Sequence, residues 1–325
     1  MKMNPFNRKL PKIDNPPQVA ALKIADIHLS HAPPVARSAE PDWYAAMARP
    51  FRQLRSLQEK YNVPVICAGD IFDRWNSPAE LINFAMKELP DGTYAVPGQH
   101  DLPHHEYGAI KKSAYWTLIE AKKIVNLIPG RPVEVGEGGK ALRLHGFPWG
   151  FPVEPLKDPH DMVLEVAVVH SYIWSEMSKS GYPGAPEEMK LKSYTKKVKG
   201  YHVAVFGDNH LPFLTSVDGH KTKVLNCGGL MRRISNEKER PCYVGLLWSD
   251  GTVTREELDC SEDKWIGEKD APIIQDGEGM KEFLEELSSL GDAAINFADA
   301  VHHRLEAGCV NRDVYKILLE AMEKK

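Results

Sequence analysis

Residues 19–28 of this chain read VAALKIADIH, a short apolar run that ends in an aspartate and a histidine. Four later runs share this design, because each is rich in β-branched residues, as strands are, and each leads directly into polar side chains. They cover residues 63–68, 93–96, 164–169 and 202–206. Helical spacing between the early runs, at 50–60 behind Pro50 and at 77–89, makes the pattern that of an α/β fold. Further strands are expected at 221–226, 243–248 and 253–258.

The polar residues that follow the five runs are of the types that hold metal ions. In chain order they are Asp26 and His28, Asp70 and Asp73, Gln99 with His100 and Asp101, His170, and finally Asp208 with His210. In open α/β sheets, sites form beyond the carboxyl ends of the strands, so these side chains are predicted to converge. Imidazole and carboxylate ligands without a thiolate favour divalent manganese, magnesium, iron or zinc over copper.

Composition limits the class of protein. A chain of 325 residues with 42% hydrophobic and 26% charged residues suits one large globular domain with a smaller appendage. Its five cysteines are scattered without CxxC pairs, which indicates reduced thiols. No stretch approaches the roughly 20 apolar residues of a membrane helix, and the first residues lack the apolar core of a signal peptide. We therefore expect a cytoplasmic protein with no membrane partner.

Charge is sorted along the chain. The net charge of −4 opposes binding to nucleic acid by bulk electrostatics. Residues 187–200, however, hold five lysines against two glutamates, and residues 231–240 are also rich in arginine and lysine. A solvated surface and a contact with an anionic substrate are equally good interpretations of both strips.

The order of the motifs resembles that of the calcineurin-like metallophosphoesterases. The motifs are D-x-H at Asp26, G-D-x-x-D at Gly69, G-x-H-D at Gly98, a lone histidine after a strand, and a closing G-x-x-H at Gly207. Within that superfamily, the phrases KIADIHLS, ICAGDIFDRW and VPGQHD look like the nuclease subunit of SbcCD-type DNA repair complexes of bacteria and large phages. The resemblance extends over residues 19–260.

The resemblance implies a sandwich of two mixed β-sheets flanked by helices, and a site for two divalent ions, with Mn²⁺ expected and Mg²⁺ as the alternative. It assigns Asp26, His28 and His210 to the first ion, Asp70 as the bridge, and Gln99, His170 and Asp208 to the second ion. His100 would donate a proton to the leaving group, with Asp101 orienting its imidazole. Asp73 would support a ligand.

Two positions depart from the pattern. The family usually has asparagine before the catalytic histidine, where this chain has Gln99, and it closes with G-H-x-H, where this chain has Asp208. Gln99 keeps the amide oxygen on a longer side chain, and Asp208 replaces a neutral imidazole by an anionic oxygen. The change favours manganese or magnesium over zinc at the second position. A second ion that is weakly bound or absent is the alternative.

The resemblance implies metal-dependent hydrolysis of DNA phosphodiesters by the exonuclease or endonuclease subunit of a repair or recombination complex, in bacterial or phage-infected cytoplasm. A phosphoesterase for small nucleotides or phosphoproteins is one alternative, and a catalytically weakened scaffold is another. The complete set of motif histidines and aspartates opposes the scaffold. His31, His104, His105 and His145, like Trp75, Tyr107 and Trp149, are interpreted as loop or packing residues more readily than as substrate contacts.

The composition changes after residue 261. Residues 1–261 form the expected metallophosphoesterase domain, 262–277 a charged linker, and 278–325 a helical hairpin with two apolar stripes. Residues 271–325 hold 11 acidic against 6 basic residues, which opposes DNA binding there. The resemblance supplies a protein partner for this hairpin, an SbcC-like coiled-coil ATPase subunit. A homodimer through Ile110, Tyr115 and Leu118 is also considered, although burial against the chain's own sheet explains these residues equally well.

Overall fold

The structure, a computed structural model, describes residues 16–160, 163–182, 184–217 and 222–267. The chain divides into two compact units, residues 1–180 with 187–266 and residues 181–186 with 267–325. The helices and strands of the described residues all belong to the first unit. The predicted hairpin at 278–325 and the linker beyond residue 267 lie outside the described residues.

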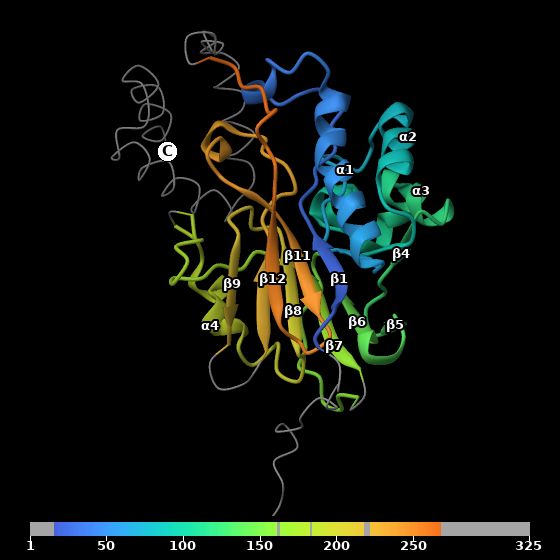
Figure 1. The fold of residues 1–325 in the computed structure, drawn as a ribbon, viewed down its shortest axis with the longest axis vertical. Coiled ribbons are helices and arrows are strands. Elements are labelled where there is room, and N and C mark those ends of the chain that lie inside the picture. The colour runs from blue at the N-terminus through green and yellow to red at the C-terminus, as the bar shows by residue number, and fades with distance from the viewer. Residues whose placement is uncertain (1–15, 161–162, 183, 218–221, 268–325) are drawn as a thin grey trace, which may run out of the picture. The chain divides into compact units, whose positions relative to one another are not determined.

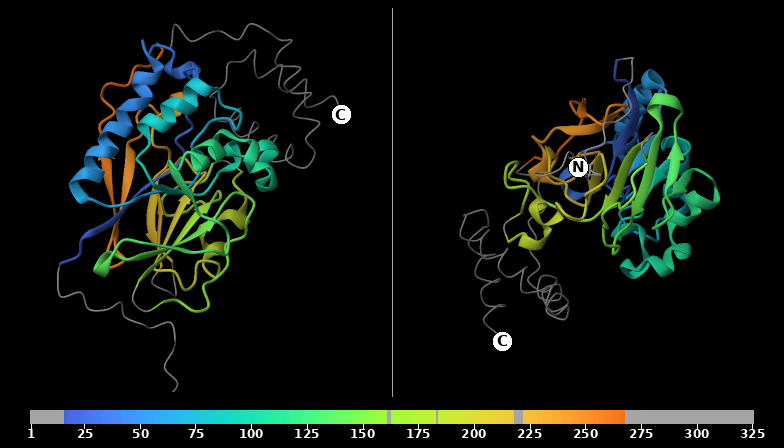
Figure 2. Two further views of the ribbon diagram at one scale, coloured as in Figure 1. Left: turned by 90° about the vertical axis from the view of Figure 1, so that its right-hand side faces the viewer. Right: turned by 90° about the horizontal axis from the view of Figure 1, so that it is seen from below.

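Two six-stranded sheets form the centre of the first unit (Figures 1 and 2). The first sheet has the order β12-β11-β1-β2-β3-β4 and the second the order β5-β6-β7-β8-β10-β9. The strands are β1 (Val19–Ile24), β2 (Val65–Cys67), β3 (Thr93–Ala95), β4 (Ile124–Asn126), β5 (Val133–Val135), β6 (Leu142–Phe147), β7 (Leu164–His170), β8 (Val203–Gly207), β9 (Phe213–Ser216), β10 (Lys223–Asn226), β11 (Cys242–Trp248) and β12 (Val253–Leu258).

Both sheets mix parallel and antiparallel pairs. Strands β1 to β4 run parallel, and the hairpin of β11 and β12 adds antiparallel to β1. In the second sheet β6, β7, β8 and β10 are parallel, while β5 and β9 pair antiparallel at the two edges. The predicted α/β fold with two mixed sheets is therefore confirmed.

Helices cover the outer faces of the two sheets. They are α1 (Trp43–Tyr61), α2 (Ala79–Glu88), α3 (Ala114–Glu120) and α4 (Leu191–Tyr194). Helices α1, α2 and α3 share a core with β1, β2 and β11, whereas α4 packs on β7 and β8 (Figure 1). A third core of mostly alanine, valine and leucine fills the space between the sheets. The first unit thus has the layer order helix, sheet, sheet, helix.

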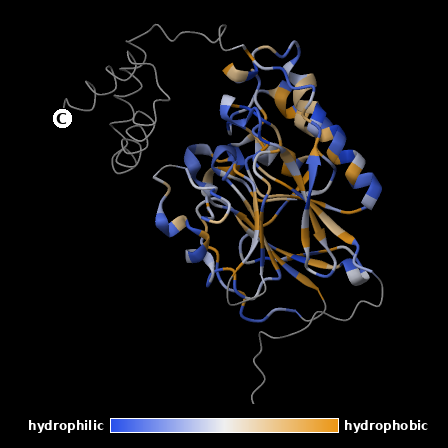
Figure 3. Cartoon of the chain, turned by 60° about the vertical axis from the view of Figure 1, so that its left-hand side comes forward, coloured by the Kyte–Doolittle hydropathy of each residue, from blue (hydrophilic) through white to orange (hydrophobic). Residues whose placement is uncertain are grey.

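Strand β7 shows why the predicted strands read as unbroken apolar runs. Val166 and Val168 face the core between the sheets, and Ala167 and Val169 face the outer core under α4. Because a strand covered on both faces has no wetted side, its sequence does not alternate between apolar and polar residues. Figure 3 shows in orange the apolar residues of the strands at the centre.

Helix α1 begins earlier than predicted. The expected start at Pro50 is wrong, because the helix runs from Trp43 and Asp42 caps it by accepting a hydrogen bond from the backbone nitrogen of Ala45 (3.0 Å). Pro50 lies inside the helix, where it removes one backbone donor. Burial of the face that includes Met47 and Phe51 outweighs this loss.

The side chains of Ile110, Tyr115 and Leu118 are buried in the core under the first sheet. They pack against their own sheet, which was one of the two interpretations. Among the described residues, no helix has both the length and the apolar composition needed to cross a membrane.

Candidate metal centre

The loops after β1 and β2 are hydrogen-bonded to each other along the backbone. The nitrogen of Asp26 donates to the oxygen of Gly69 (3.0 Å), and that of His28 donates to the oxygen of Asp70 (2.9 Å). Asp26, His28, Asp70 and also Asp208 after β8 adopt positive φ angles of 49° to 79°. Such left-handed backbone is costly for non-glycine residues and concentrates at functional sites. This backbone conformation directs the side chains that follow several strands toward one point.

Two glycines allow the side chains to approach one another. A Cβ atom at Gly98 would lie 2.0 Å from Asp70 Oδ1, and one at Gly69 would lie 2.1 Å from His170 Nδ1. Gly69 also has a φ angle of +97°, which residues with a side chain rarely adopt. The glycines of the G-D-x-x-D and G-x-H-D motifs therefore leave the room that the ligands occupy.

Three overlapping groups of side chains bring potential ligand atoms within 4.8 Å of one another. They are Asp26 with His28 and His210, His28 with Asp70 and His100, and Asp26 with Asp70 and His170. Five of the seven predicted ligands are thus brought together from the ends of four strands. Shared members link the groups, as expected for ions that lie side by side.

Unsatisfied polar atoms show that these residues fit cations. Oδ2 of Asp26 and Oδ2 of Asp70 are buried and accept no hydrogen bond. Nε2 of His28 faces Nε2 of His210 at 3.1 Å, so two ring nitrogens converge on one position. Since a buried carboxylate oxygen without a partner is costly, divalent cations held by Asp26, His28, Asp70, His170 and His210 would satisfy this donor set.

Burial and neighbouring charge set the protonation of the ligands. Burial lowers the pKa of His28 well below its usual value, so the imidazole is a neutral ligand. Burial alone would raise the pKa of Asp70, but the charge of His170 lowers it below its usual range. Burial alone would lower the pKa of His170, but Asp70 raises it to about 10. Because an imidazole nitrogen that carries a proton cannot ligate, a cation held by His170 would displace a proton.

The two residues that depart from the family pattern contact each other. Gln99 donates a hydrogen bond from Nε2 to Oδ1 of Asp208 (2.8 Å), and its Oε1 lies 2.6 Å from Nε2 of His170. The other ring nitrogen of His170 donates to the backbone oxygen of Ala68 (2.6 Å), which leaves Nε2 to face the site. Asp208 belongs to none of the three ligand groups of the described residues. Burial raises its pKa.

His100 lies at the site, but its imidazole is oriented differently from the expectation. Its Nδ1 donates to the backbone oxygen of Asp73 (2.9 Å), and its ring meets that of His28 edge-on, with centroids 4.9 Å apart. Its backbone nitrogen donates to Oδ1 of Asp70 (3.0 Å). Because a carbonyl only accepts, Nδ1 carries a proton and Nε2 is the nitrogen free to exchange one.

Asp101 orients backbone and not the His100 imidazole. Its fully buried carboxylate accepts hydrogen bonds from the backbone nitrogens of Ile71 (3.2 Å), Phe72 (3.0 Å) and Gly98 (3.0 Å). Burial, followed by the charge of Asp70, raises the pKa of Asp101 to about 7. The adjacency of histidine and aspartate in the sequence predicts a pair, but within the tight turn over Gln99–Asp101 the two side chains bond to different groups.

Charged residues from the loop after β10 contact the ligand His210, and the sequence does not predict these contacts. Oε1 of Glu237 lies 3.5 Å from Nδ1 of His210 and 3.1 Å from Nη2 of Arg240. Burial alone would raise the pKa of Glu237, but the hydrogen bond with His210 and the charge of Arg240 lower it to about 2. Such a carboxylate fixes the orientation of a metal-ligating histidine.

Arg233 brings a positive charge to the edge of the site. Its Nη2 lies 2.8 Å from Oδ1 of Asp73, and that same oxygen lies 3.6 Å from Nδ1 of His28. Nε of Arg233 is buried without a hydrogen-bond partner. Asp73 therefore lies between the guanidinium of Arg233 and the ring of His28.

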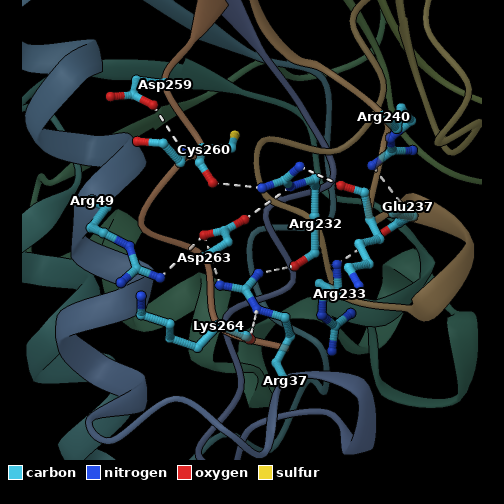
Figure 4. A network of polar contacts seen from close by, with 12 residues as sticks. Arg37, Arg49, Arg232, Arg233, Glu237, Arg240, Asp259, Cys260, Asp263 and Lys264 are labelled. Atoms are coloured by element: carbon cyan, nitrogen blue, oxygen red, sulfur yellow. Dashed lines mark hydrogen bonds and ion pairs between the residues drawn. The ribbon is translucent and has the colours of Figure 1, made fainter. Parts of the chain in front are cut away.

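Much of the basic strip at 231–240 has a structural role (Figure 4). Arg232 binds Asp263 (2.9 Å), which also pairs with the buried Arg37 (2.8 Å). Arg240 pairs with Glu237 and donates to the backbone oxygen of His210. The interpretation of this strip as a free anion-binding surface is therefore wrong for Arg232 and Arg240, which are largely buried in the network.

The four other histidines that lie near the motifs divide into two sets. His31 contacts Tyr44 (3.0 Å) and His145 contacts Glu165 (2.7 Å), and neither belongs to the ligand groups. His104 and His105, by contrast, follow the G-x-H-D motif and lie close to Gln99 and Trp75.

The sequence matches the model of the calcineurin-like phosphoesterase family over residues 22–212, which include every residue placed at the site except those of the loop after β10. The chain belongs to this family of metallophosphoesterases, which use two divalent metal ions. No curated protein matches this chain.

Solved structures resemble this chain at low identity. The sulfate thiohydrolase SoxB of Thermus thermophilus is 10% identical, with a TM-score of 0.43, and the match covers 78% of this chain and 59% of that one. The NAD nucleotidase of Haemophilus influenzae is 15% identical, with a TM-score of 0.43 and coverage of 89% and 60%. An archaeal phosphodiesterase is 14% identical, with a TM-score of 0.38 and coverage of 73% and 99%. The chain thus spans about 60% of the length of the first two.

Proposed function

We propose that this metallophosphoesterase is a DNA nuclease that hydrolyses phosphodiester bonds. The observation that supports the proposal best is the set of three overlapping ligand groups, one of which includes His100, with Arg233 paired to Asp73 at its edge. The motif phrases quoted above, which look like those of SbcCD-type nucleases, favour DNA as the substrate. Two divalent ions bound here would neutralise the phosphate oxygens and lower the pKa of the attacking water toward neutrality.

The side chains of the site perform the remaining steps. Asp26, His28, Asp70, His170 and His210 hold the ions, and Arg233 contributes positive charge toward the phosphate. Water attacks phosphorus and gives up one proton to solvent, while the bond from phosphorus to the leaving sugar oxygen breaks. The leaving oxygen takes a proton from Nε2 of His100, whose other nitrogen is fixed by Asp73. His100 regains its proton from solvent.

The test compares substrates on one metal-free preparation that is reloaded with Mn²⁺ or Mg²⁺. We expect Mn²⁺-dependent release of nucleotides from linear duplex or single-stranded DNA, together with hydrolysis of an aryl phosphodiester. Hydrolysis of the aryl ester and of small nucleotides without cleavage of DNA would contradict the DNA nuclease and favour the small-substrate alternative. Absence of all hydrolysis with intact metal binding would favour the scaffold.

We also propose that residues 278–325 bind an SbcC-like coiled-coil ATPase subunit. The proposal depends on the two apolar stripes and the acidic charge of this segment, and on the resemblance to SbcCD-type nucleases. Deletion of residues 271–325 should preserve hydrolysis of the aryl phosphodiester and abolish co-purification with the ATPase. Retained binding to the ATPase would contradict the assignment.

A further inference from the structure

A cavity of about 310 Å³ opens beside the metal centre, and Gln99 and His100 form part of its wall. Its volume lies at the lower end of the range for small-molecule pockets in proteins. Both residues belong to the site described above, because Gln99 contacts His170 and Asp208, and His100 is a member of a ligand group. A group in this cavity would therefore be connected directly to a phosphate at the metal centre.

The cavity has an aromatic wall. The half-buried ring of Trp75 and the exposed ring of His104 both line it, with centroids 6.3 Å apart and planes inclined by 44°. A partly exposed tryptophan ring in a cavity offers a flat face on which a planar group can stack. Leu102 is a buried apolar residue of the same wall.

The loop that carries Trp75 is fixed by hydrogen bonds before any ligand binds. The backbone oxygens of Asp73, Arg74 and Trp75 accept from Nδ1 of His100 (2.9 Å), Oγ of Ser77 (2.8 Å) and the nitrogen of Ala114 (2.7 Å). Because the loop is already ordered, stacking on Trp75 does not carry the entropic cost of ordering it.

Two consecutive residues that line the cavity have a strained backbone. His104 and His105 are consecutive and have φ angles of 53° and 59°, in the left-handed region that side chains disfavour. His105 is tied to the metal centre, since its Nδ1 donates to the backbone oxygen of Gln99 (3.0 Å). Strained non-glycine residues persist where the surroundings impose them, and they concentrate at ligand sites.

The polar groups of the cavity suit a neutral, hydrogen-bonding ring attached to an anion. The exposed side chains of Arg74 and Asn76 provide a positive charge and an amide. Asp73 is the cavity's carboxylate, and it is paired with Arg233 at 2.8 Å, so its charge is offset. An unpaired nucleobase combines a planar face, polar edges and a neighbouring phosphate.

We propose that this cavity binds the nucleoside on the leaving-group side of the cleaved phosphodiester, with its base stacked on Trp75. This inference rests on the proposed function, and it adds which part of the substrate is recognised. The side is assigned by His100, which lines the cavity and donates the proton to the leaving oxygen. The nucleoside attached to that oxygen is therefore the one nearest to the cavity.

The experiment uses the full chain loaded with Mn²⁺ and dinucleotides that contain a single phosphodiester. The position of the phosphate in the products identifies the leaving nucleoside. Replacing the leaving nucleoside by an abasic residue should lower kcat/KM about tenfold, within the range provided by stacking of one base. The same replacement on the other side should change kcat/KM little. Equal kcat/KM for all three dinucleotides would overturn the proposal. So would a kcat/KM that falls only when the nucleoside on the other side of the phosphate is abasic.

Variants connect this effect to the tryptophan. Trp75→Ala should lower kcat/KM for the intact dinucleotide about tenfold, so that the intact and abasic dinucleotides are cleaved equally well. Trp75→Phe should preserve most of the difference in kcat/KM between these two substrates, because its ring can still stack on a base. Trp248→Ala is the matched control, because Trp248 is also half-buried but lies on β11, outside the residues that line the cavity. A Trp75→Ala variant that still discriminates against the abasic substrate would contradict the role of Trp75.

Binding measured without turnover separates this inference from the proposed function. Calorimetric titration of the Mn²⁺-loaded protein with the free leaving nucleoside should show binding that Trp75→Ala weakens about tenfold and Trp248→Ala does not. If neither DNA nor dinucleotide is cleaved but this pattern of binding is found, the nuclease is wrong and the base pocket holds. If DNA is cleaved but Trp75→Ala binds the nucleoside as well as the unaltered protein, the base pocket is wrong and the nuclease holds.

Discussion

The side-chain amide of Gln99 donates a hydrogen bond of 2.8 Å to the carboxylate of Asp208, from the end of another sheet. These are the two positions at which the chain departs from the motif pattern of the family it resembles. The longer side chain of Gln99 reaches Asp208 while its oxygen faces His170 at 2.6 Å. A carboxylate accepts what the amide donates, so the two departures form one compensating pair.

The first prediction is that these two positions depend on each other. Gln99→Asn shortens the amide by one methylene and breaks its bond to Asp208, and Asp208→His replaces the acceptor. Each single variant should lose activity, and the double variant should recover part of it. The coupling energy is expected within about 0.5–3 kcal/mol. Hydrolysis of an aryl phosphodiester by all four proteins measures it, and strictly additive losses would show that the pair is not coupled.

The second prediction concerns the backbone role of Asp101. Asp101→Asn keeps the size of the side chain but replaces one acceptor oxygen by a donor, which leaves a backbone nitrogen among Ile71, Phe72 and Gly98 without its partner. The free energy of unfolding should fall by about 1.5–3 kcal/mol, the worth of a hydrogen bond to a charged group. Urea unfolding measures the change. A variant with unaltered stability but reduced turnover would indicate instead that Asp101 orients the imidazole of His100.

The third prediction separates proton transfer from metal binding. His100→Asn should bind metal and DNA but lose about two to four decades of kcat on DNA, the usual worth of general acid catalysis. His31→Asn is the control, because His31 is exposed and contacts Tyr44 outside the ligand groups. Turnover of His100→Asn near that of the unaltered protein would remove His100 from the mechanism.

The fourth prediction is that metal ions stabilise the fold through Asp70. Removal of metal should lower the Tm, and Mn²⁺ at 100 times its Kd should restore about 2.7 kcal/mol of stability. Asp70→Asn keeps an acceptor for the His100 nitrogen but removes the charge, so it should lose both the metal content and the Mn²⁺-dependent gain. Elemental analysis and thermal unfolding test this. Full metal occupancy in Asp70→Asn would show that Asp70 is not a bridging ligand.

Strand ends explain how much of the site the sequence predicts. Asp26 and Asp70 follow buried strands and His170 ends one, and parallel strands of the two sheets bring them together. The apolar runs are readable because both faces of the sheets are covered. Strand β4 does not show such a run, because only its first residue, Ile124, is buried, whereas β2, of the same length, is buried throughout.

Residues that reach the site from a long loop escape sequence analysis. Glu237 approaches His210 only because the loop after β10 folds back, and no spacing in the sequence encodes that contact. The bond of the His100 imidazole to Asp73, and not to Asp101, is not predictable either, because adjacency in the chain does not determine which groups two side chains contact in a tight turn. Gln99 and Asp208 could each be recognised as departures, but their pairing depends on the meeting of two sheets.

The last prediction concerns the acid stability of the network around Glu40. The side chain of Glu40 is 1% exposed, and its Oε1 lies 2.5 Å from Nη2 of both Arg37 and Arg49. Burial alone would raise the pKa of Glu40, but hydrogen bonds from Arg49 and Arg37 lower it in the folded protein. A carboxyl whose pKa is lower when folded contributes stability above its unfolded value, near 4.3, and that contribution is lost as the pH falls through the folded value.

The free energy of unfolding of Glu40→Gln should therefore be lower than that of the unaltered protein by about 1–3 kcal/mol at pH 7, and the difference should shrink below about pH 4.3. Urea unfolding from pH 7 to pH 3, with chelator present so that metal ligands contribute equally, measures both curves. Glu257→Gln is the control, since Glu257 is exposed on β12 and should follow the unaltered protein at every pH. A difference for Glu40→Gln that stays constant across this range would show that the ionisation of Glu40 does not stabilise the fold.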